Sequence, residues 1–184
     1  MTRLLDENRL RNEALSLMEG RGSILDTARE VTALLRASGV SAAVIGGIAV
    51  VLHGHWRSTR DIDLLAGSPL EAIAGVLEAH GFHHDPARRE FVRDGIPVHL
   101  VSPEQAGALV GDMVEIEGIV TVALPDLIAM KLRSGSANML RAQDLADVIG
   151  LIRRCRLTGE FARNLDRALR PTFRKLARAI EREG

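Results

Sequence analysis

The sequence predicts an α+β protein: a small mixed β-sheet flanked by helices, followed by a helical C-terminal portion. Short apolar runs bounded by turn residues, of which Ala42–Ile45 is the first, are typical of buried strands and alternate with helical periodicity. Beyond Leu124 the periodicity is helical throughout. A length of 184 residues suits one domain with a helical extension. We therefore expect an α/β core with N-terminal helices over residues 1–123 and a helical portion packed on it over residues 124–184.

Composition narrows the classes of function. Apolar residues make up 46% of the chain, but aromatic residues only 3%, so an aliphatic core is expected and a base-stacking platform is not. The single cysteine, Cys155, excludes an internal disulfide and a multi-cysteine zinc site, and we expect it to be a buried small residue. No apolar signal core opens the chain and no apolar run reaches membrane-spanning length. A soluble, cytoplasmic protein without a membrane partner is expected.

The first part of the chain predicts two helices and a strand. Leucines at helical spacing indicate a helix over residues 3–18, which Gly20 and Gly22 end. Ser23 is suited to cap a second helix, which closes at residues 38–39. The first strand follows directly over residues 40–45.

The later elements follow from turn residues and periodicity. Ser68 is suited to cap a helix with proline in its first turn, and that helix ends at Gly81. Strands are expected over residues 90–93 and 96–101 across an Asp-Gly turn, and a short helix from residue 102. Two further strands are expected over residues 113–116 and 119–122. Helices are then expected over residues 125–133, 138–156 and from 158 onward, and Pro171 is expected to split the last of them.

Three histidines, His80, His83 and His84, lie close together in the sequence. A metal site is not expected there, because Gly81 breaks the helix and the spacing fits no common zinc pattern.

One stretch carries most of the chemistry. Gly46 and Gly47 end the first strand, allow close approach of backbone to a ligand, and precede a short helix over residues 48–52 whose start attracts phosphate. Asp61 and Asp63 then open the second strand. Because strand side chains alternate, these carboxylates are expected on one face, about 7 Å apart along the strand. They are placed to hold a divalent cation against a nucleotide phosphate.

Taken in this order, these features resemble the nucleotidyltransferase superfamily with the DNA polymerase beta-like fold, and within it the AbiEii/AbiGii-type toxins and their relatives. The residues that carry the resemblance are Gly46, Gly47, His53, Gly54, Arg57, Thr59, Asp61 and Asp63. The resemblance implies a metal-dependent enzyme that moves a nucleoside monophosphate from a nucleoside triphosphate to a hydroxyl. It also implies that Asp61 and Asp63 hold Mg²⁺ or Mn²⁺ while Gly46 and Gly47 cradle the phosphates.

The same resemblance implies a set of residues that contact the triphosphate. They are Arg57, Ser58, Thr59, Lys131, Arg141 and Asp144. Lys131 is one of only two lysines in the chain, and Asp147 lies one turn from Asp144 on the same helix face. Two simpler alternatives remain open: Arg141 pairs with Asp144, and Lys131 is a side chain that extends from a helix edge to solvent.

One expected ligand is missing. Members of the superfamily usually carry a third carboxylate on the strand beside the aspartate pair, and here His99 holds that position. Imidazole adds no negative charge, and a lost ligand worth about 3–4 kcal/mol in the transition state slows chemistry about 100- to 1000-fold. His99 is then a general base or a ligand for Mn²⁺, Zn²⁺ or Ni²⁺, and Glu90 and Asp94 are candidates to replace the carboxylate.

Two functions follow from these observations. The first is an active nucleotidyltransferase whose acceptor is a tRNA, a protein or a small molecule, with the toxin of a toxin–antitoxin pair, and hence an antitoxin partner, as the context that the resemblance implies. The second is a catalytically degenerate module that binds nucleotide or a partner, because His99 replaces the third carboxylate.

Charge is distributed unevenly although the net charge is zero. From Arg153 to the end, ten basic residues face four acidic ones. The basic residues are Arg153, Arg154, Arg156, Arg163, Arg167, Arg170, Arg174, Lys175, Arg178 and Arg182. Such C-terminal helices bind a polyanion such as tRNA or an acidic partner, or they present a solvated face.

Overall fold

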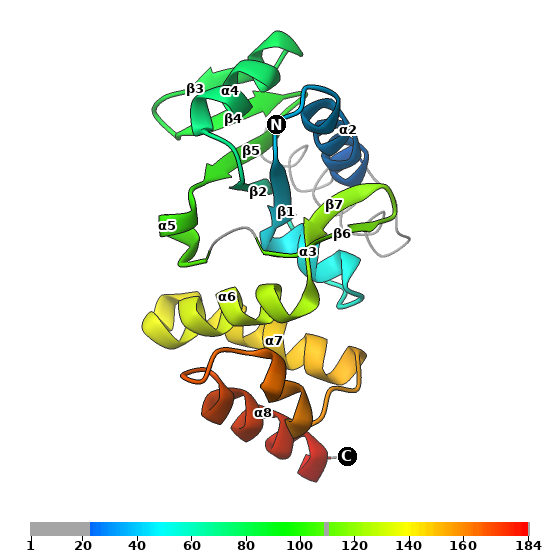
Figure 1. Cartoon of the computed structure of the whole chain (residues 1–184), viewed down its shortest axis with the longest axis vertical. Helices are drawn as coiled ribbons and strands as arrows, with labels where there is room; N and C mark the ends of the chain where they lie inside the picture. The colour runs from blue at the N-terminus through cyan, green and yellow to red at the C-terminus, as the bar shows by residue number, and fades with distance from the viewer. Residues whose placement is uncertain (1–22, 109–110, 184) are drawn as a thin grey trace, which may run out of the picture.

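The structure, a computed structural model, describes residues 23–108 and 111–183 (Figure 1). The helix predicted over residues 3–18 lies outside this part of the chain. The predicted α+β architecture is confirmed: a mixed sheet is flanked by helices, and a helical portion follows it in the chain.

The described residues form one seven-stranded sheet in the order β3-β4-β5-β2-β1-β7-β6. The strands are β1 (Ala42–Ile45), β2 (Ile62–Ala66), β3 (His83–Asp85), β4 (Glu90–Arg93), β5 (Ile96–Val101), β6 (Met113–Ile116) and β7 (Ile119–Val122). Two pairs of neighbouring strands near the centre of the sheet, β2 with β5 and β1 with β7, are parallel, and the other pairs are antiparallel. The predicted mixed character of the sheet therefore arises at its centre.

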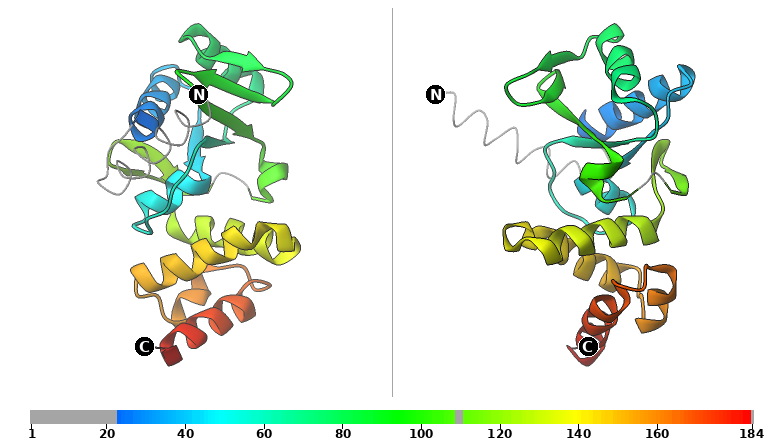
Figure 2. Two further views of the ribbon diagram at one scale, coloured as in Figure 1. Left: turned by 180° about the vertical axis from the view of Figure 1, so that it is seen from behind. Right: turned by 60° about the vertical axis from the view of Figure 1, so that its left-hand side comes forward.

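The earlier helices of the chain lie beside the sheet, and the later ones stack on one another beyond it. The helices are α2 (Ser23–Ala37), α3 (Gly46–Leu52), α4 (Leu70–Ala79), α5 (Pro103–Ala106), α6 (Leu124–Ala137), α7 (Ala142–Arg154) and α8 (Arg170–Glu183), with 3₁₀ helices at Met139–Arg141 and Gly159–Asn164. Helices α6, α7 and α8 follow one another along the long axis, away from the sheet, in all three views (Figure 2). No helix in the described ranges is long and apolar enough to cross a bilayer.

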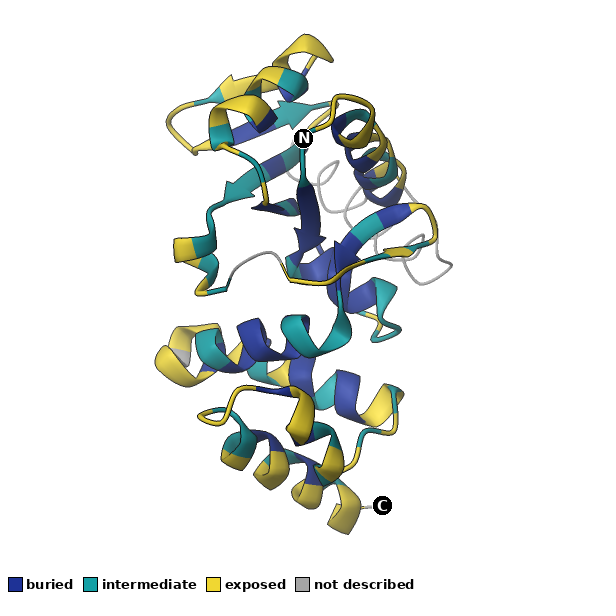
Figure 3. Cartoon of the chain, in the orientation of Figure 1, coloured by how far each residue is buried: buried dark blue, intermediate teal, exposed yellow. Residues whose placement is uncertain are grey.

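Alternation along β1 and β2 sends apolar side chains into two cores. Val44 and Leu64 pack in the core that includes α2 and α4, whereas Ala43 and Leu65 pack in the core that includes α6, α7 and α8. Buried residues accordingly line the facing sides of these elements, and the outer side of α8 is exposed (Figure 3). Asp63 lies two residues before Leu65 and therefore faces the helical portion.

One prediction of a helix start is wrong and one is confirmed. Ser68 does not cap α4, because Pro69 occupies the N-cap position and the Ser68 hydroxyl instead accepts a hydrogen bond from the Ser41 backbone N–H at 2.9 Å. The predicted division of the last helical segment near Pro171 is confirmed: a 3₁₀ helix at Gly159–Asn164 is followed by α8, which begins at Arg170. Pro171 lies in the first turn of α8. Its missing N–H is not needed there, since the first N–H groups of a helix have no intrahelical partner.

Sequence patterns also missed one strand and misplaced one helix start. The short edge strand β3 carries no apolar alternation: His83 and His84 are both exposed, and the His84 ring stacks on Phe91 with the ring centroids 4.8 Å apart. The helix predicted from residue 138 begins as a 3₁₀ turn, where Asn138 Oδ1 accepts a hydrogen bond from the Leu140 N–H, and α7 starts only at Ala142.

The helical portion docks on the core through the segment that follows α3. Arg154 Nε donates a hydrogen bond to the Gly54 carbonyl at 3.1 Å, and the Cys155 thiol lies 3.5 Å from the His53 carbonyl. The His55 ring occupies the space that any side chain at Gly150 would fill. Cys155 is therefore a half-buried interface residue rather than a fully buried one.

Candidate functional site

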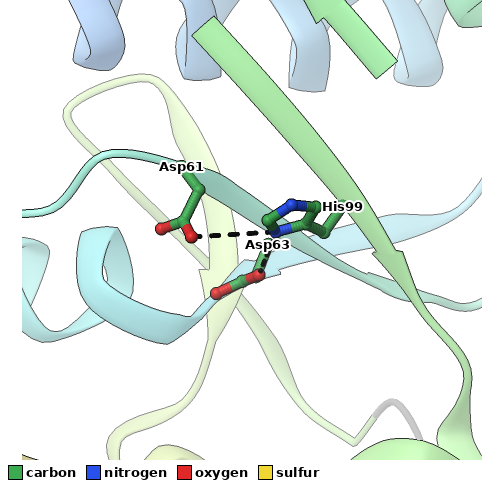
Figure 4. A group of neighbouring side chains, drawn as sticks. All are labelled: Asp61, Asp63 and His99. Carbon is green, nitrogen blue, oxygen red and sulfur yellow. Dashed lines mark hydrogen bonds and ion pairs between the residues drawn. The ribbon is translucent and has the colours of Figure 1, made fainter. Parts of the chain in front are cut away.

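Asp61, Asp63 and His99 converge on one face of the sheet. The parallel pairing of β2 with β5 places Asp63 directly beside His99, and Asp61 lies on the same face because it precedes Asp63 by two residues. His99 Nδ1 lies 3.3 Å from Asp63 Oδ1 and 3.7 Å from Asp61 Oδ2 (Figure 4). One ligand atom from each residue falls within 4.8 Å of the others. Two carboxylate oxygens and one imidazole nitrogen at this spacing fit a divalent cation.

Gly46 and Gly47 allow the side chains of the site to come close to the start of α3. Gly46 has φ +68°, and a Cβ there would overlap the Asp63 carboxylate. A Cβ at Gly47 would overlap Thr59 and crowd the Arg57 guanidinium. The helix begins at Gly46 itself, two residues earlier than predicted. The two glycines thus bring Asp63, Arg57 and Thr59 together, and their predicted contact with phosphate stays a prediction.

A buried carboxylate stands on the far side of the His99 ring. Glu90, at the start of β4, accepts a hydrogen bond from His99 Nε2 at 3.1 Å, and its side chain is 11% exposed. The other carboxylate considered from the sequence, Asp94, lies in the turn, where its side chain is 89% exposed and 3.9 Å from Arg93. Of these two candidates, Glu90 is therefore the one that reaches the site, and it does so through His99.

These carboxylates determine the charge of His99. The hydrogen bond to Asp63 is the largest influence and raises the pKa of His99. Partial burial lowers this pKa, while the Glu90 hydrogen bond and the negative charges of Asp63 and Asp61 raise it further. The pKa rises to about 9 from the ordinary 6.5. Without a bound cation, His99 is therefore an imidazolium near neutral pH and offsets part of the negative charge around it.

The first prediction concerns this pKa. An NMR titration of the metal-free protein should give a His99 pKa near 9, and Asp63→Asn should lower it. The pKa of His99 is higher in the folded protein than in the unfolded chain, so protonation of His99 stabilises the folded state. This stabilisation is complete below pH 6.5 and is lost as pH rises through about 9. Asp26→Asn, at an exposed aspartate of α2 paired with Arg29, is the control and should leave the His99 pKa unchanged. An ordinary His99 pKa in the parent protein would contradict this arrangement of charges.

A buried network of charges forms the wall of the site opposite the sheet. Lys131 Nζ of α6 lies 2.6 Å from Asp144 Oδ1 and 2.8 Å from Asp147 Oδ2, both on α7. Arg57 Nε, from the segment before β2, lies 3.0 Å from the other oxygen of Asp147, whose side chain is fully buried. Burial raises the pKa of Asp144, but hydrogen bonds from Lys131 and Ser134, together with the positive charges of Lys131 and Arg141, hold the pKa below its ordinary value. Lys131 is thus a buried, paired cation and not a lysine extending to solvent.

The remaining predicted contacts line the same cleft of about 800 Å³. Arg141 is largely exposed; its Nη1 donates to Ser134 Oγ at 3.2 Å and lies 3.7 Å from Asp144, so the predicted pairing forms. Thr59 Oγ1 donates to Asp61 Oδ1 at 3.3 Å, and Ser58 is exposed at the mouth. All eleven residues predicted for the site therefore lie in one cleft: Gly46, Gly47, Arg57, Ser58, Thr59, Asp61, Asp63, His99, Lys131, Arg141 and Asp144. Their roles toward a nucleotide stay predictions.

Two further residues of the site received no definite role from the sequence. The resemblance grouped Asp147 with Arg141 and Asp144, and helical spacing places it on the face of Asp144, but neither indicates that Asp147 is the fully buried partner of two cations. Ser134, which donates to Asp144 at 2.6 Å, gave no signal at all, because a serine on a helix is common on any exposed face.

The second prediction tests the buried network. Asp147→Asn removes the carboxylate shared by Arg57 and Lys131 and should lower the free energy of unfolding by about 3–5 kcal/mol, since it leaves buried charge without its partner. Urea unfolding followed by circular dichroism measures the change. Asp166→Asn, which breaks the exposed pair with Arg133, should cost at most about 1 kcal/mol. Equal losses in the two variants would show that Asp147 contributes no more than a surface ion pair.

No protein-family model matches the sequence, and no curated protein matches it. A nucleotidyltransferase-like antigenic protein from Paracoccidioides brasiliensis aligns with a TM-score of 0.47 and 15% identity over 69% of this chain and 76% of its own. A tRNA-processing enzyme in its apo form aligns with 0.41 and 16% over 87% of this chain and 48% of its own, and a tRNA-processing enzyme complex with 0.37 and 13% over 81% and 46%.

The chain therefore spans about half the length of the tRNA-processing enzymes that it matches. Every one of these three TM-scores is below 0.5 and every identity is below 25%, so they assign neither a family nor an activity to this chain.

Proposed function

We propose that this protein is a metal-dependent nucleotidyltransferase of the DNA polymerase beta-like superfamily, which moves a nucleoside monophosphate from a nucleoside triphosphate to a hydroxyl. The observation that carries the proposal is the convergence of Asp61, Asp63 and His99 beside Gly46, at a cleft whose opposite wall holds Arg57 and Lys131. Negative ligands on one side and cations on the other suit a metal–triphosphate complex between them.

In this proposal each residue acts by position and charge. Asp61 and Asp63 hold Mg²⁺ or Mn²⁺, which neutralises phosphate charge when bound. The backbone at Gly46 and Gly47 cradles the phosphates. The other residues proposed to contact the triphosphate are Arg57, Ser58, Thr59, Lys131, Arg141 and Asp144. His99 occupies the third ligand position and serves as a metal ligand or as the base for the attacking hydroxyl.

A second function is favoured by a separate observation. The imidazolium of His99 already lies among Asp61, Asp63 and Glu90, where it offsets negative charge that a cation otherwise balances. A module that keeps the fold and binds nucleotide or a partner without turnover is consistent with this internal cation. The AbiEii-type relationship, with a toxin role and an antitoxin partner, is part of the first proposal.

The acceptor in the first proposal is a hydroxyl of a tRNA, a protein or a small molecule. Helix α8 supports a polyanionic or acidic partner because its outer side is basic while Phe173 and Ala177 pack inward. The exposed basic residues on it are Arg174, Lys175, Arg178 and Arg182. We place the reaction in the cytoplasm.

The third prediction separates the two functions. Purified protein with labelled nucleoside triphosphates and Mg²⁺ or Mn²⁺ should transfer label to a hydroxyl acceptor, and Asp63→Asn should slow the transfer about 100- to 1000-fold through loss of a ligand worth about 3–4 kcal/mol. Total tRNA, the protein itself and small alcohols are the acceptors to test. Asp26→Asn should transfer at the parent rate. Nucleotide binding without transfer to any acceptor would favour the module, and transfer that is independent of Asp63 would reject the site.

The fourth prediction concerns the missing carboxylate. His99→Asp supplies a third anionic ligand and should strengthen Mg²⁺ binding in a calorimetric titration. Without metal, the new carboxylate lies near Glu90, Asp61 and Asp63, so the same change should destabilise the metal-free protein by like-charge repulsion. If the second function holds, this variant should also gain transfer activity. Unchanged Mg²⁺ affinity would mean that position 99 is not a ligand position.

A further inference from the structure

Three side chains form a row across three neighbouring strands. Asp63 of β2 is the register partner of His99 on β5. Phe91 of β4 pairs with Val98 of β5, so the antiparallel register continues to place Glu90 opposite His99. Residues directly opposite in adjacent strands share a face of the sheet. The imidazole is consequently held between two carboxylates, with Nδ1 toward Asp63 and Nε2 toward Glu90.

Glu90 is fixed in this position. Its side chain is 11% exposed, its Oε2 accepts from His99 Nε2 at 3.1 Å, and its Oε1 lies 3.6 Å from Arg88 Nη1. It contacts the ring on the side opposite Asp61 and Asp63, so it cannot share a cation with them directly. Through this contact Glu90 controls the orientation of the His99 ring.

We propose that Glu90 is a positioning residue that keeps Nδ1 of His99 turned toward Asp61 and Asp63, and that the resulting Asp–Asp–His site selects Mn²⁺ over Mg²⁺. A histidine that ligates a metal through one nitrogen commonly donates its other N–H to a carboxylate, which fixes the ring and its tautomer. Glu90 supplies that acceptor at Nε2, so Nδ1 is the nitrogen that releases its proton to solvent and offers its lone pair to the cation. Mg²⁺ prefers an all-oxygen shell, whereas Mn²⁺ accepts imidazole nitrogen.

This selectivity rests on the metal role proposed for Asp61 and Asp63, but not on transfer of a nucleotide. It is therefore measured on metal ions alone. If the protein binds Mn²⁺ selectively but transfers no nucleotide, the proposed enzyme is rejected and the selective metal site stands. If Mg²⁺ supports transfer and no imidazole nitrogen ligates the metal, the selective site is rejected and the proposed enzyme stands.

Calorimetric titration of the full chain compares its affinities for Mn²⁺ and Mg²⁺. Pulsed EPR of the Mn²⁺-loaded full chain at the same pH detects a nitrogen ligand. The parent protein should bind Mn²⁺ more tightly than Mg²⁺ and show coupling of Mn²⁺ to one imidazole nitrogen. His99→Asp should abolish the coupling and narrow the difference between the two metals. Absence of nitrogen coupling in the parent protein would overturn the assignment.

Variants at Glu90 test its positioning role. Glu90→Met removes the acceptor and should weaken Mn²⁺ binding about 10- to 100-fold with weaker nitrogen coupling. Glu90→Gln keeps an acceptor oxygen, so it should lose less affinity and remains informative if the methionine variant does not fold. Glu115→Met, on the edge strand β6 at the opposite end of the sheet, is the matched control and should change neither readout.

A double-variant cycle separates positioning from simple charge. If Glu90 acts through the imidazole, Glu90→Met should have no further effect on Mn²⁺ affinity in a His99→Ala background. An equal loss of Mn²⁺ and Mg²⁺ affinity that persists in that background would show that Glu90 contributes only its negative charge, and would overturn the proposal.

Discussion

The parallel pairing of β2 with β5 is the contact on which the site depends. It places Asp63 beside His99 although the two residues are 36 positions apart in the chain. The neighbouring antiparallel pair, β4 with β5, adds Glu90 to the same row. A shift of one residue in either register would turn the shifted side chains to the other face of the sheet, where the α2 and α4 core is apolar. The apolar neighbours of the site residues, such as Ile62 between Asp61 and Asp63 and Val98 before His99, oppose such a shift because they are buried.

The helical portion completes the cleft through charges that are themselves buried. Asp147 binds Arg57 from the core and Lys131 from α6, so one carboxylate of α7 joins three segments of the chain. Asp144 and Ser134 extend this network toward the cleft, where Arg141 is exposed. Breaking such a network costs more than a surface pair, since a cation left in the interior loses both water and its partner. The same contacts that hold the two portions together therefore hold cations along the wall of the site.

Charge balance gives a physical reason for a histidine at position 99. Asp61, Asp63 and Glu90 bring three carboxylates to one small region, and imidazolium at His99 offsets part of their repulsion in the absence of a cation. With a cation bound between Asp61 and Asp63, the same ring is placed to supply a neutral nitrogen. One side chain can thus stabilise both states, which an aspartate at this position cannot do.

The sequence by itself determined the α+β class and most strands and helices, because alternation, turn residues and helical periodicity are local properties. The same local patterns brought Gly46, Gly47, Asp61 and Asp63 to attention, whereas the other residues of the cleft were predicted from the family resemblance. The resemblance also predicted that His99 stands where a third carboxylate is expected, and this stays a prediction. The sequence did not determine the edge strand β3, which lacks apolar alternation, or the role of Ser68, whose hydroxyl bonds to Ser41 across the chain. Only the tertiary structure decided that Asp147 lies fully buried between two cations and that Glu90 stands behind His99. Those pairings depend on strand register and helix docking, and contacts between distant residues leave no mark in the local pattern of a single sequence.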